Sequence, residues 1–268
     1  MIGARNSAGP AVVLRARGIE ATGLARACFT TRQGGTGGGP YRSLNLSYAV
    51  GDGRAAVDRN RRLAAAALGA DPRRLVEAQQ VHGTSAAVVG PRDAGRVVAG
   101  VDALMTACPG VWLAVHTADC VPVLVLDPGR PAVAAVHVGW RGVAAGTVHA
   151  ALAPLRTAFR TDLARCLVAL GPSIGSCCYE VDRPVADAMR AAPWWHRAAQ
   201  AGAPGRWYLD LRVAVRAQLA AVGVVPDHVE MTPGCTRCEP DLYFSYRRER
   251  ATGRMAACIR LCERAQRE

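Results

Sequence analysis

VWLAVHTADCVPVLVLDPGRPAVAAVHVGWRGVAAG, residues 111–146, contains apolar runs that predict neighbouring strands of a buried sheet. Its first segment closes at Cys120 and its second contains His137. Thiolate and imidazole are ligands that zinc prefers, and neither belongs at the edge of an apolar core strand unless something binds it. One more ligand would therefore complete an open catalytic zinc site.

The segments on either side of this stretch alternate between strand and helix patterns. Before it, an alanine-rich helix is predicted at 55–68 with a glycine stop at Gly69, followed by a strand at 101–106, and the stretch itself begins with a strand at 111–115. Beyond it we predict a helix at about 143–159, strands at 167–170, 207–211, 228–231 and 254–261, and a helix from an Asp210 cap to about 222. The central order resembles a strand-turn-strand-helix unit whose polar residues gather at one end.

Composition indicates one globular domain over residues 1–268. The hydrophobic content of 50% supplies ample material for a core, and we expect residues 1–20 to be a loose start. No apolar run approaches the ~20 residues that span a bilayer, and the N-terminus lacks the signal-peptide pattern. The ten cysteines have no framework-like spacing, so we expect reduced thiols and a cytoplasmic protein that does not bind membranes.

The formal charge of +12 comes from 33 Lys and Arg residues against 21 Asp and Glu residues, and most of the basic residues are arginine. This pattern often reflects a GC-rich genome, but it also fits a phosphorylated or anionic small substrate. Aromatic residues make up only 5% of the chain, and no basic run is interleaved with them. We therefore do not expect a nucleic-acid partner.

Two glycine-rich segments offer possible anion sites. Arg32 precedes the loop 34–39, GGTGGG, and is predicted to be either a solvated loop charge or an anion clamp. The loop 171–175, GPSIG, is expected to present free backbone amides to an anion. Neither spacing matches a Walker loop or a dinucleotide fingerprint.

His82, Cys120 and His137 each lie where a predicted strand meets a loop or is interrupted. Three protein ligands with a vacant fourth position are the catalytic form of a zinc site. Their spacing matches no contiguous zinc motif, so the three residues would have to meet through the sheet. A cysteine nucleophile is the alternative, with Cys120 activated by His137 and oriented by Asp119 or another carboxylate. His82 discriminates between the two hypotheses, because a thiol hydrolase needs only one histidine whereas the zinc site uses both.

The other cysteine motifs give weaker predictions. Cys235-Thr-Arg-Cys238 lacks the second pair of a zinc ribbon, and its late position does not favour a thioredoxin-like role. The vicinal pair Cys177-Cys178 is predicted to be structural, with one sulfur facing the core.

Eight short blocks, in order along nearly the whole chain, resemble the YfiH or laccase-domain family. They are FTTRQGG (29–35), SLNL (43–46), QVHG (80–83), TADCVPVL (117–124), AAVHVGWRG (134–142), GPSIG (171–175), CYEV (178–181) and FSYRR (244–248). Members of this family are called polyphenol oxidase, purine nucleoside phosphorylase or peptidoglycan editing factor.

The resemblance implies a mixed α/β (α+β) fold, a layered sandwich of central mixed sheets covered by helices, related to the cytotoxic-necrotizing-factor type of cysteine deamidase. It also implies that His82, Cys120 and His137 are zinc ligands and that Arg32 lies near substrate or phosphate. Two residues depart from the family pattern, His116 and Val138. His116 is expected to be a structural residue; the alternatives are a side chain that hydrogen-bonds to a metal ligand and an extra metal ligand.

The function implied by the resemblance is phosphorolysis of adenosine, inosine and methylthioadenosine to free base and ribose 1-phosphate, with adenosine deamination at the same site. Zinc would lower the pKa of its water, which attacks the purine carbon that bears the amine. Phosphate would be held by Arg32, Arg141 and the glycine-rich turns, including Gly171 and Ser173. We expect a monomer, although the sequence does not fix the oligomeric state.

Three rival functions stay open at this point. With copper in place of zinc the protein would be a polyphenol oxidase, although six histidines without a His-x-His pair favour a mononuclear site. The Cys120 and His137 pair would alternatively serve amide hydrolysis in the editing of peptidoglycan precursors. The third rival is a non-catalytic partner protein with a closed structural zinc site.

Overall fold

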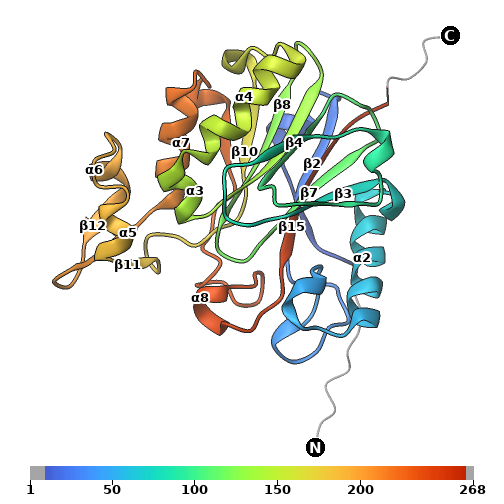
Figure 1. Ribbon diagram of the computed structural model, residues 1–268. Helices are drawn as coiled ribbons and strands as arrows, with labels where there is room; N and C mark the ends of the chain where they lie inside the picture. The colour runs from blue at the N-terminus through green and yellow to red at the C-terminus, as the bar shows by residue number, and fades with distance from the viewer. Residues whose placement is uncertain (1–9, 264–268) are drawn as a thin grey trace, which may run out of the picture.

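Two six-stranded mixed sheets form the centre of the structure, a computed structural model that describes residues 10–263 (Figure 1). The first sheet has the order β1 (Val13–Arg15), β2 (Ala25–Thr30), β15 (Met255–Leu261), β7 (Trp112–Thr117), β3 (Leu75–Gln79) and β5 (Val97–Ala99). The second has the order β14 (Val229–Met231), β10 (Leu167–Leu170), β8 (Val121–Asp127), β9 (Ala132–Val138), β6 (Ala103–Thr106) and β4 (Ala86–Val88).

Eight α-helices are described alongside these sheets. They are α1 (Arg17–Glu20), α2 (Arg54–Leu68), α3 (Trp140–Ala145), α4 (Thr147–Phe159), α5 (Arg183–Asp187), α6 (Trp195–Ala198), α7 (Leu211–Ala221) and α8 (Tyr246–Glu249). Among residues 10–263, none of them combines the length and apolar character needed to cross a membrane. Short 3₁₀ turns occupy Gly39–Tyr41, Tyr48–Val50, Pro72–Arg74, Pro91–Asp93, Leu163–Arg165 and Pro226–His228.

The helices and sheets form four layers, because each sheet buries both faces. Alternate residues of β8 divide between two cores: Val123 packs toward α4 and α7, and Leu124 packs toward the first sheet. Helix α2 covers the outer face of the first sheet, where Ala64 packs with Trp112 and Ala256. The predicted sandwich of mixed sheets covered by helices is therefore confirmed.

Strands β8 and β9 are antiparallel neighbours, with Pro122 opposite His137. Every residue of both strands is buried, which explains their almost continuous apolar sequence. Cys120 immediately precedes β8, so this pairing places its backbone close to that of His137. The neighbouring strands predicted from residues 111–146 are thus present, although β7 belongs to the other sheet.

Three predictions about the local structure are wrong. The helix predicted at 143–159 starts at Trp140 and is divided into α3 and α4, because Gly146 takes a left-handed conformation with φ of 76° and ends α3. The strand predicted at 207–211 is β13 (Arg206–Leu209), since Asp210 already caps α7 by accepting hydrogen bonds from two backbone amides. Within the loose start predicted for 1–20, β1 and α1 are ordered elements, while residues 1–9 lie outside the described part.

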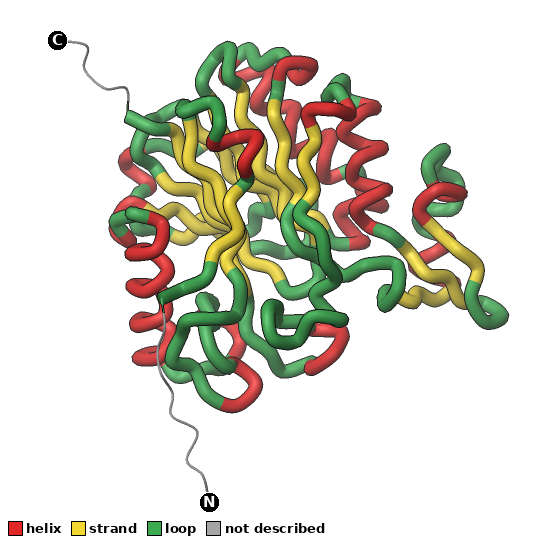
Figure 2. The backbone as a smooth tube through the Cα atoms, turned by 180° about the vertical axis from the view of Figure 1, so that it is seen from behind, coloured by secondary structure: helices red, strands yellow, loops and turns green. Residues whose placement is uncertain are grey.

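A small third sheet was not predicted as a separate unit. It has the order β11 (Glu180–Asp182), β13 and β12 (Ala199–Ala201) and carries α5 and α6. Figures 1 and 2 show this unit projecting from one side of the two main sheets, beyond α3 and α7. Its first strand reaches the cavity described below.

Glu77 on β3 links the first sheet to α2. Its carboxylate forms an ion pair with Arg61 and a 2.7 Å contact with Nε2 of His116, and its side chain is only 12% exposed. Burial alone raises the pKa of Glu77, but the hydrogen bond and charge of His116 and the charge of Arg61 outweigh it, so that the net shift is downward.

The Glu77→Gln variant is expected to lose about 1–2 kcal/mol of stability at neutral pH, because it removes a largely buried charged partner. A carboxyl whose pKa is depressed in the folded state stabilises the protein above its unfolded pKa of about 4.3, and this contribution disappears as the pH falls through the lower folded pKa. Urea unfolding at pH 7 and at stepwise lower pH should therefore show the difference shrinking below about pH 4.3. Glu263→Gln, at the exposed pair with Arg74, is the control, and a Glu77→Gln difference that is absent or independent of pH would contradict this role.

Candidate metal centre

The structure brings His82, Cys120 and His137 together. Their potential ligand atoms all lie within 4.8 Å of one another, and the Cys120 Sγ is 3.9 Å from the His82 Nε2. The two imidazole rings meet edge to face, with centroids 4.8 Å apart. The three residues come from the loop after β3, the start of β8 and the end of β9, so they meet through the sheets as their spacing required.

Asp102 shapes the loop that carries His82. Its carboxylate accepts hydrogen bonds from the backbone amides of Val81, His82 and Gly83, at 3.1, 3.0 and 2.7 Å. His82 itself adopts a positive φ of 59°, a conformation that non-glycine residues rarely take. The carboxylate therefore holds the loop in the conformation that points His82 toward the other two residues.

Asp102 also orients His137. The same carboxylate oxygen that accepts from His82 N lies 2.8 Å from the His137 Nδ1, which leaves Nε2 as the nitrogen free for a ligand. Burial raises the pKa of Asp102, but the hydrogen bonds from His137 and from the amides outweigh it and lower the pKa. The sequence reasoning missed Asp102. The available signal was a charged side chain at the start of the apolar segment 101–106, where it is fully buried.

Electrostatics favour a thiolate at Cys120. Burial raises the pKa of its thiol, but the charge of His137 and the hydrogen bonds from His137 and His82 overcome this effect and lower the pKa to about 6. For His137, burial lowers the pKa, while the Cys120 charge and the Asp102 hydrogen bond raise it to about 9. Without a metal the pair is therefore a thiolate and an imidazolium at neutral pH, and the thiolate is the form that binds metal.

Asp119 does not orient His137, which corrects one form of the nucleophile hypothesis. Its carboxylate accepts hydrogen bonds from the Thr236 hydroxyl and from the Arg247 amide, both at 2.6 Å. Its backbone carbonyl accepts from the Ile174 amide, and its φ is 107°. Asp119 thus anchors the turn before Cys120 to two distant segments.

The three candidate ligands line a cavity of about 750 Å³. His82 is exposed and Cys120 partly exposed, so a molecule in the cavity can reach them. The walls come from the loop before α2, the third sheet, α3 and α8, and they include the aromatic residues Trp140, Tyr179 and Tyr246. The cavity therefore offers aromatic faces on which a flat ring can stack beside the candidate ligands.

Arginines dominate the charged lining of this cavity. They number five, against the three acidic residues Asp119, Glu180 and Asp182, and are Arg141, Arg206, Arg247, Arg250 and Arg254. The Arg247 guanidinium donates to the Glu180 carbonyl at 2.7 Å and lies over Tyr179. The Arg141 guanidinium stacks on Trp140 at 4.3 Å from the ring centroid. The excess of positive charge in this lining favours the binding of an anion next to the three candidate metal ligands.

Arg32 is not among the residues that line the cavity. Its guanidinium donates to the carbonyls of Arg42 and Pro240, pairs with Glu249 at 3.2 Å and lies over Phe244. These contacts tie the loop after β2 to the segment around α8.

The turn 171–175 is engaged within the protein. The amides of Gly171, Ile174 and Gly175 donate to the Pro122 carbonyl, the Asp119 carbonyl and the Cys235 sulfur. The prediction that these amides are free for an anion is therefore wrong. Ser173 is fully buried, and a Cβ on Gly171 would lie 2.3 Å from the Phe29 ring, so close packing explains that glycine.

The glycine-rich loop 34–39 also packs against its own chain. A Cβ on Gly35 would lie 2.3 Å from the Ser43 carbonyl oxygen, and one on Gly34 equally close to the Pro10 carbonyl oxygen. The glycines thus permit backbone to approach backbone.

His116 lies apart from the three candidate ligands. Its Nε2 contacts Glu77, and its backbone amide and carbonyl are both hydrogen-bonded by the Gln80 side chain at 2.7 Å. These contacts support the expectation of a structural residue, although His116 also belongs to the lining of the cavity.

Residues 26–262 match the protein family described as multi-copper polyphenol oxidoreductase laccase. The chain belongs to this laccase-domain, or YfiH, family. A member from Streptomyces griseus, named purine nucleoside phosphorylase ORF3, is 42% identical over 250 residues, which cover 92% of this chain and 99% of that protein. The matched laccase-domain region contains every residue that lines the cavity.

Two solved structures share the laccase-domain fold of this chain. The crystal structure of YlmD from Geobacillus stearothermophilus superposes with a TM-score of 0.85 at 40% identity and covers 89% of this chain and 92% of that one. The crystal structure of the hypothetical protein YfiH from Bacillus licheniformis gives a TM-score of 0.88 at 34% identity, with coverage of 96% and 98%. The family resemblance predicted from the eight sequence blocks is thus confirmed.

Proposed function

We propose that this protein is a zinc-dependent purine nucleoside phosphorylase that cleaves adenosine, inosine and methylthioadenosine and also deaminates adenosine. One observation carries the proposal: His82, Cys120 and His137 converge on a nucleoside-sized cavity whose charged lining is mainly arginine. The name of the 42% identical Streptomyces griseus relative, a purine nucleoside phosphorylase, supports the same reaction.

The donor set fits zinc. Two imidazoles and one thiolate are borderline-soft ligands, and an outer carboxylate that fixes the tautomer of one histidine is typical of zinc sites. Asp102 supplies that carboxylate for His137. The partly exposed Cys120 and the exposed His82 leave room for a further ligand from the cavity. A zinc ion held there would supply Lewis-acid chemistry, polarising a bound oxygen and lowering the pKa of a water molecule.

Phosphorolysis requires that the protein bind a phosphate anion next to the ribose of the nucleoside. A phosphate oxygen forms a bond to the anomeric carbon while the bond from that carbon to the purine nitrogen breaks, and the departing base takes up a proton. Arginine side chains that face the cavity neutralise the phosphate and hold it for attack. We assign this role to Arg141, with Arg247 as a second arginine of the same cavity lining. Arg32, Gly171 and Ser173 would act by holding the surrounding loops.

The direct test is purine release from each nucleoside with and without phosphate. We expect adenine to appear from adenosine only when phosphate is present, while inosine appears in either case. Ribose 1-phosphate should equal the sum of adenine and hypoxanthine, because the inosine formed by deamination is cleaved as well. Release of adenine at the same rate with and without phosphate would indicate a hydrolase. The absence of a purine product from all three nucleosides would contradict the proposed function.

Arg141→Ala is expected to lower kcat/KM for adenosine phosphorolysis about 10- to 100-fold, because one charge-assisted contact to phosphate is lost. Deamination of adenosine, which uses no phosphate, should change much less. Product analysis at several phosphate concentrations separates the two activities, and Arg141→Lys should restore part of the loss. In the Arg32→Ala control, which loosens a loop outside the cavity, both activities should fall together. Equal losses of both activities in Arg141→Ala would remove the phosphate role.

A thiol hydrolase that edits peptidoglycan precursors is the second candidate, because Cys120, His137 and Asp102 form a line of nucleophile, base and orienting carboxylate. A hydrolase of this type would be blocked by iodoacetamide and would survive chelation. The zinc enzyme should lose its activity on chelation and regain it with zinc. A muropeptide that carries the wrong amino acid is the discriminating substrate.

Copper is the alternative metal, since two histidines and one cysteine are also the ligands of mononuclear blue-copper sites. Among residues 10–263, only one other group of at least three His, Cys, Asp or Glu residues could hold a metal, and it contains no histidine. A multi-copper oxidase centre would need more histidines than these. Oxygen uptake with a phenol and added copper tests the oxidase reading.

We also propose that the protein acts in the cytoplasm, because all ten cysteines are free thiols in the structure.

A further inference from the structure

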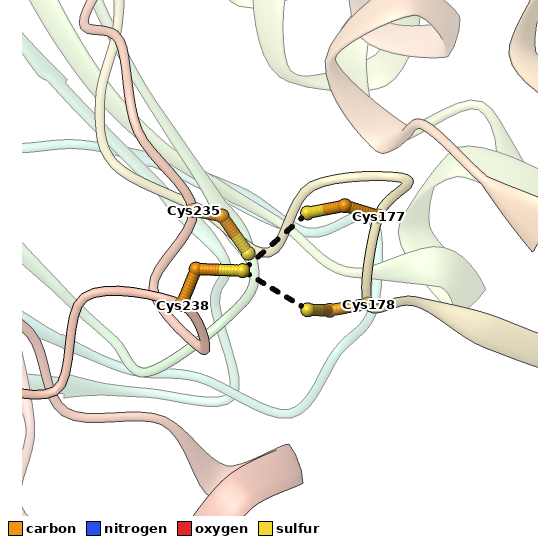
Figure 3. A group of neighbouring side chains, drawn as sticks. All are labelled: Cys177, Cys178, Cys235 and Cys238. Atoms are coloured by element: carbon orange, nitrogen blue, oxygen red, sulfur yellow. Dashed lines mark hydrogen bonds between the residues drawn. The ribbon is translucent and has the colours of Figure 1, made fainter.

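Four cysteines from two distant loops converge beside the cavity (Figure 3). The Cys238 sulfur lies 3.6 Å from that of Cys177 and 3.3 Å from that of Cys178, and the sulfurs of these three residues and Cys235 all lie within 4.8 Å of one another. The motif Cys235-Thr-Arg-Cys238 lacks a second pair in the sequence around it. The fold supplies that pair from about 60 residues earlier in the chain.

The spacing of the sulfurs suits a single tetrahedral ion. A zinc ion with bonds of about 2.3 Å to four thiolates places the sulfurs about 3.8 Å apart. The sulfurs here are close to this separation, so an ion fits with small side-chain shifts. Cys235 and Cys178 pack at the edge of the core, but Cys177 and Cys238 are exposed, so burial of apolar surface does not account for the position of these two sulfurs.

A backbone donor from the first cysteine loop already contacts the Cys235 sulfur. The Gly175 amide donates a hydrogen bond of 3.2 Å to the Cys235 sulfur, so the loop of the first pair supports a sulfur of the second. Arg237 adds positive charge next to Cys178. Such amide-to-sulfur bonds stabilise the charge that a metal-bound thiolate carries.

We propose that Cys177, Cys178, Cys235 and Cys238 bind one zinc ion in a closed, structural site that is separate from His82, Cys120 and His137. On binding, each thiol gives up its proton and donates a sulfur lone pair to the ion. Four protein ligands leave no position for substrate, so this ion would act on structure alone.

The position of this second site indicates what it would hold in place. Thr236, between the two cysteines of the motif, donates its amide to the Ser173 carbonyl and its hydroxyl to Asp119, the residue before Cys120. Tyr179 follows Cys178 and lines the cavity. An ion shared by the two loops would therefore fix the cavity wall next to Cys120.

Native mass spectrometry of the wild-type protein, purified under reducing conditions, is the first test of the proposal. We expect a mass that corresponds to two zinc ions per chain. One zinc ion together with a loss of two hydrogens would indicate a disulfide in this cluster and would overturn the proposal. One zinc ion per chain with all thiols reduced would also overturn the proposal if the Cys177→Ser/Cys238→Ser variant still binds that ion, because the ion would then lie outside the four-cysteine cluster.

Matched variants then assign each ion. Cys177→Ser/Cys238→Ser should lose one zinc per chain, Cys120→Ala should lose the other, and the combined variant should bind none. Cys262→Ser, outside both groups, should keep two. If the Cys120→Ala variant, with all four cysteines of the cluster intact, binds no zinc, the four-cysteine site is refuted while the catalytic proposal stands. If the double serine variant keeps both ions, the second ion binds elsewhere and the proposal also fails.

Discussion

Cys120→Ala is expected to lose one zinc per chain and to lower kcat/KM for adenosine phosphorolysis and deamination by at least about 10³-fold. The substitution removes the only sulfur among the three candidate ligands, and two histidines alone hold zinc weakly. It also removes the negative charge that raises the pKa of His137, so this imidazole becomes more readily neutral. Metal content and product formation measured on the same preparation connect the two losses.

Cys262→Ala is the matched control, because this cysteine is also partly exposed and belongs to neither group of potential ligands. It should keep wild-type zinc content and activity. A Cys120→Ala protein that binds zinc at this centre and still releases adenine would contradict the assignment of the site.

Asp102→Ala is expected to weaken zinc binding by about 10- to 100-fold or more, because the outer partner of His137 is lost. It should also cost about 3–5 kcal/mol of stability, since three backbone amides and one imidazole lose a buried acceptor. Urea unfolding of the chelated protein measures the structural part. Competition with a zinc-binding dye then measures the affinity of the folded protein.

Asp102→Asn is the informative companion variant, because it keeps one acceptor oxygen at nearly the same volume. We expect it to recover part of the stability but to bind zinc less tightly than wild type, since the negative charge facing His137 is gone. If Asp102→Ala unfolds and binds zinc like wild type, the carboxylate has neither role.

Local patterns predicted the core strands well. The apolar runs around Cys120 and His137 gave β8 and β9, and the alanine-rich segment gave α2 with Gly69 as its left-handed end, φ 61°. The division of the strands between two sheets was not predictable from these patterns, because a strand buried on both faces has the same composition in either sheet. The break at Gly146 was missed because a single glycine is compatible both with a helix interior and with a helix end.

The candidate ligands were predictable, whereas their supports were not. His82 joined Cys120 and His137 through the family blocks, but Asp102 serves them through contacts 19 to 35 residues away along the chain. The same limit hid the second half of the four-cysteine cluster. Side chains that meet only through tertiary structure leave no local pattern in the sequence.

Arg32 illustrates the opposite error. The sequence pattern left Arg32 as either a solvated loop charge or an anion clamp, and the family resemblance implied a position near substrate or phosphate, yet its guanidinium hydrogen-bonds to carbonyls of its own chain. These carbonyls and the Glu249 carboxylate occupy donors of the guanidinium, and the sequence does not reveal them. The arginines that do line the cavity come from separate segments, with Arg141 on α3 and Arg206 on β13.

Binding of a metal ion by His82, Cys120 and His137 is the claim on which the proposed chemistry depends. Diffraction from one crystal of the wild-type protein, recorded on both sides of the zinc absorption edge, tests it most directly. We expect an anomalous peak within bonding distance of the Cys120 Sγ and the two imidazoles, on the cavity side, and a second peak among the four cysteines. A peak at the cysteines alone, in protein that still converts adenosine and phosphate to adenine, would contradict a zinc-dependent reaction at this site.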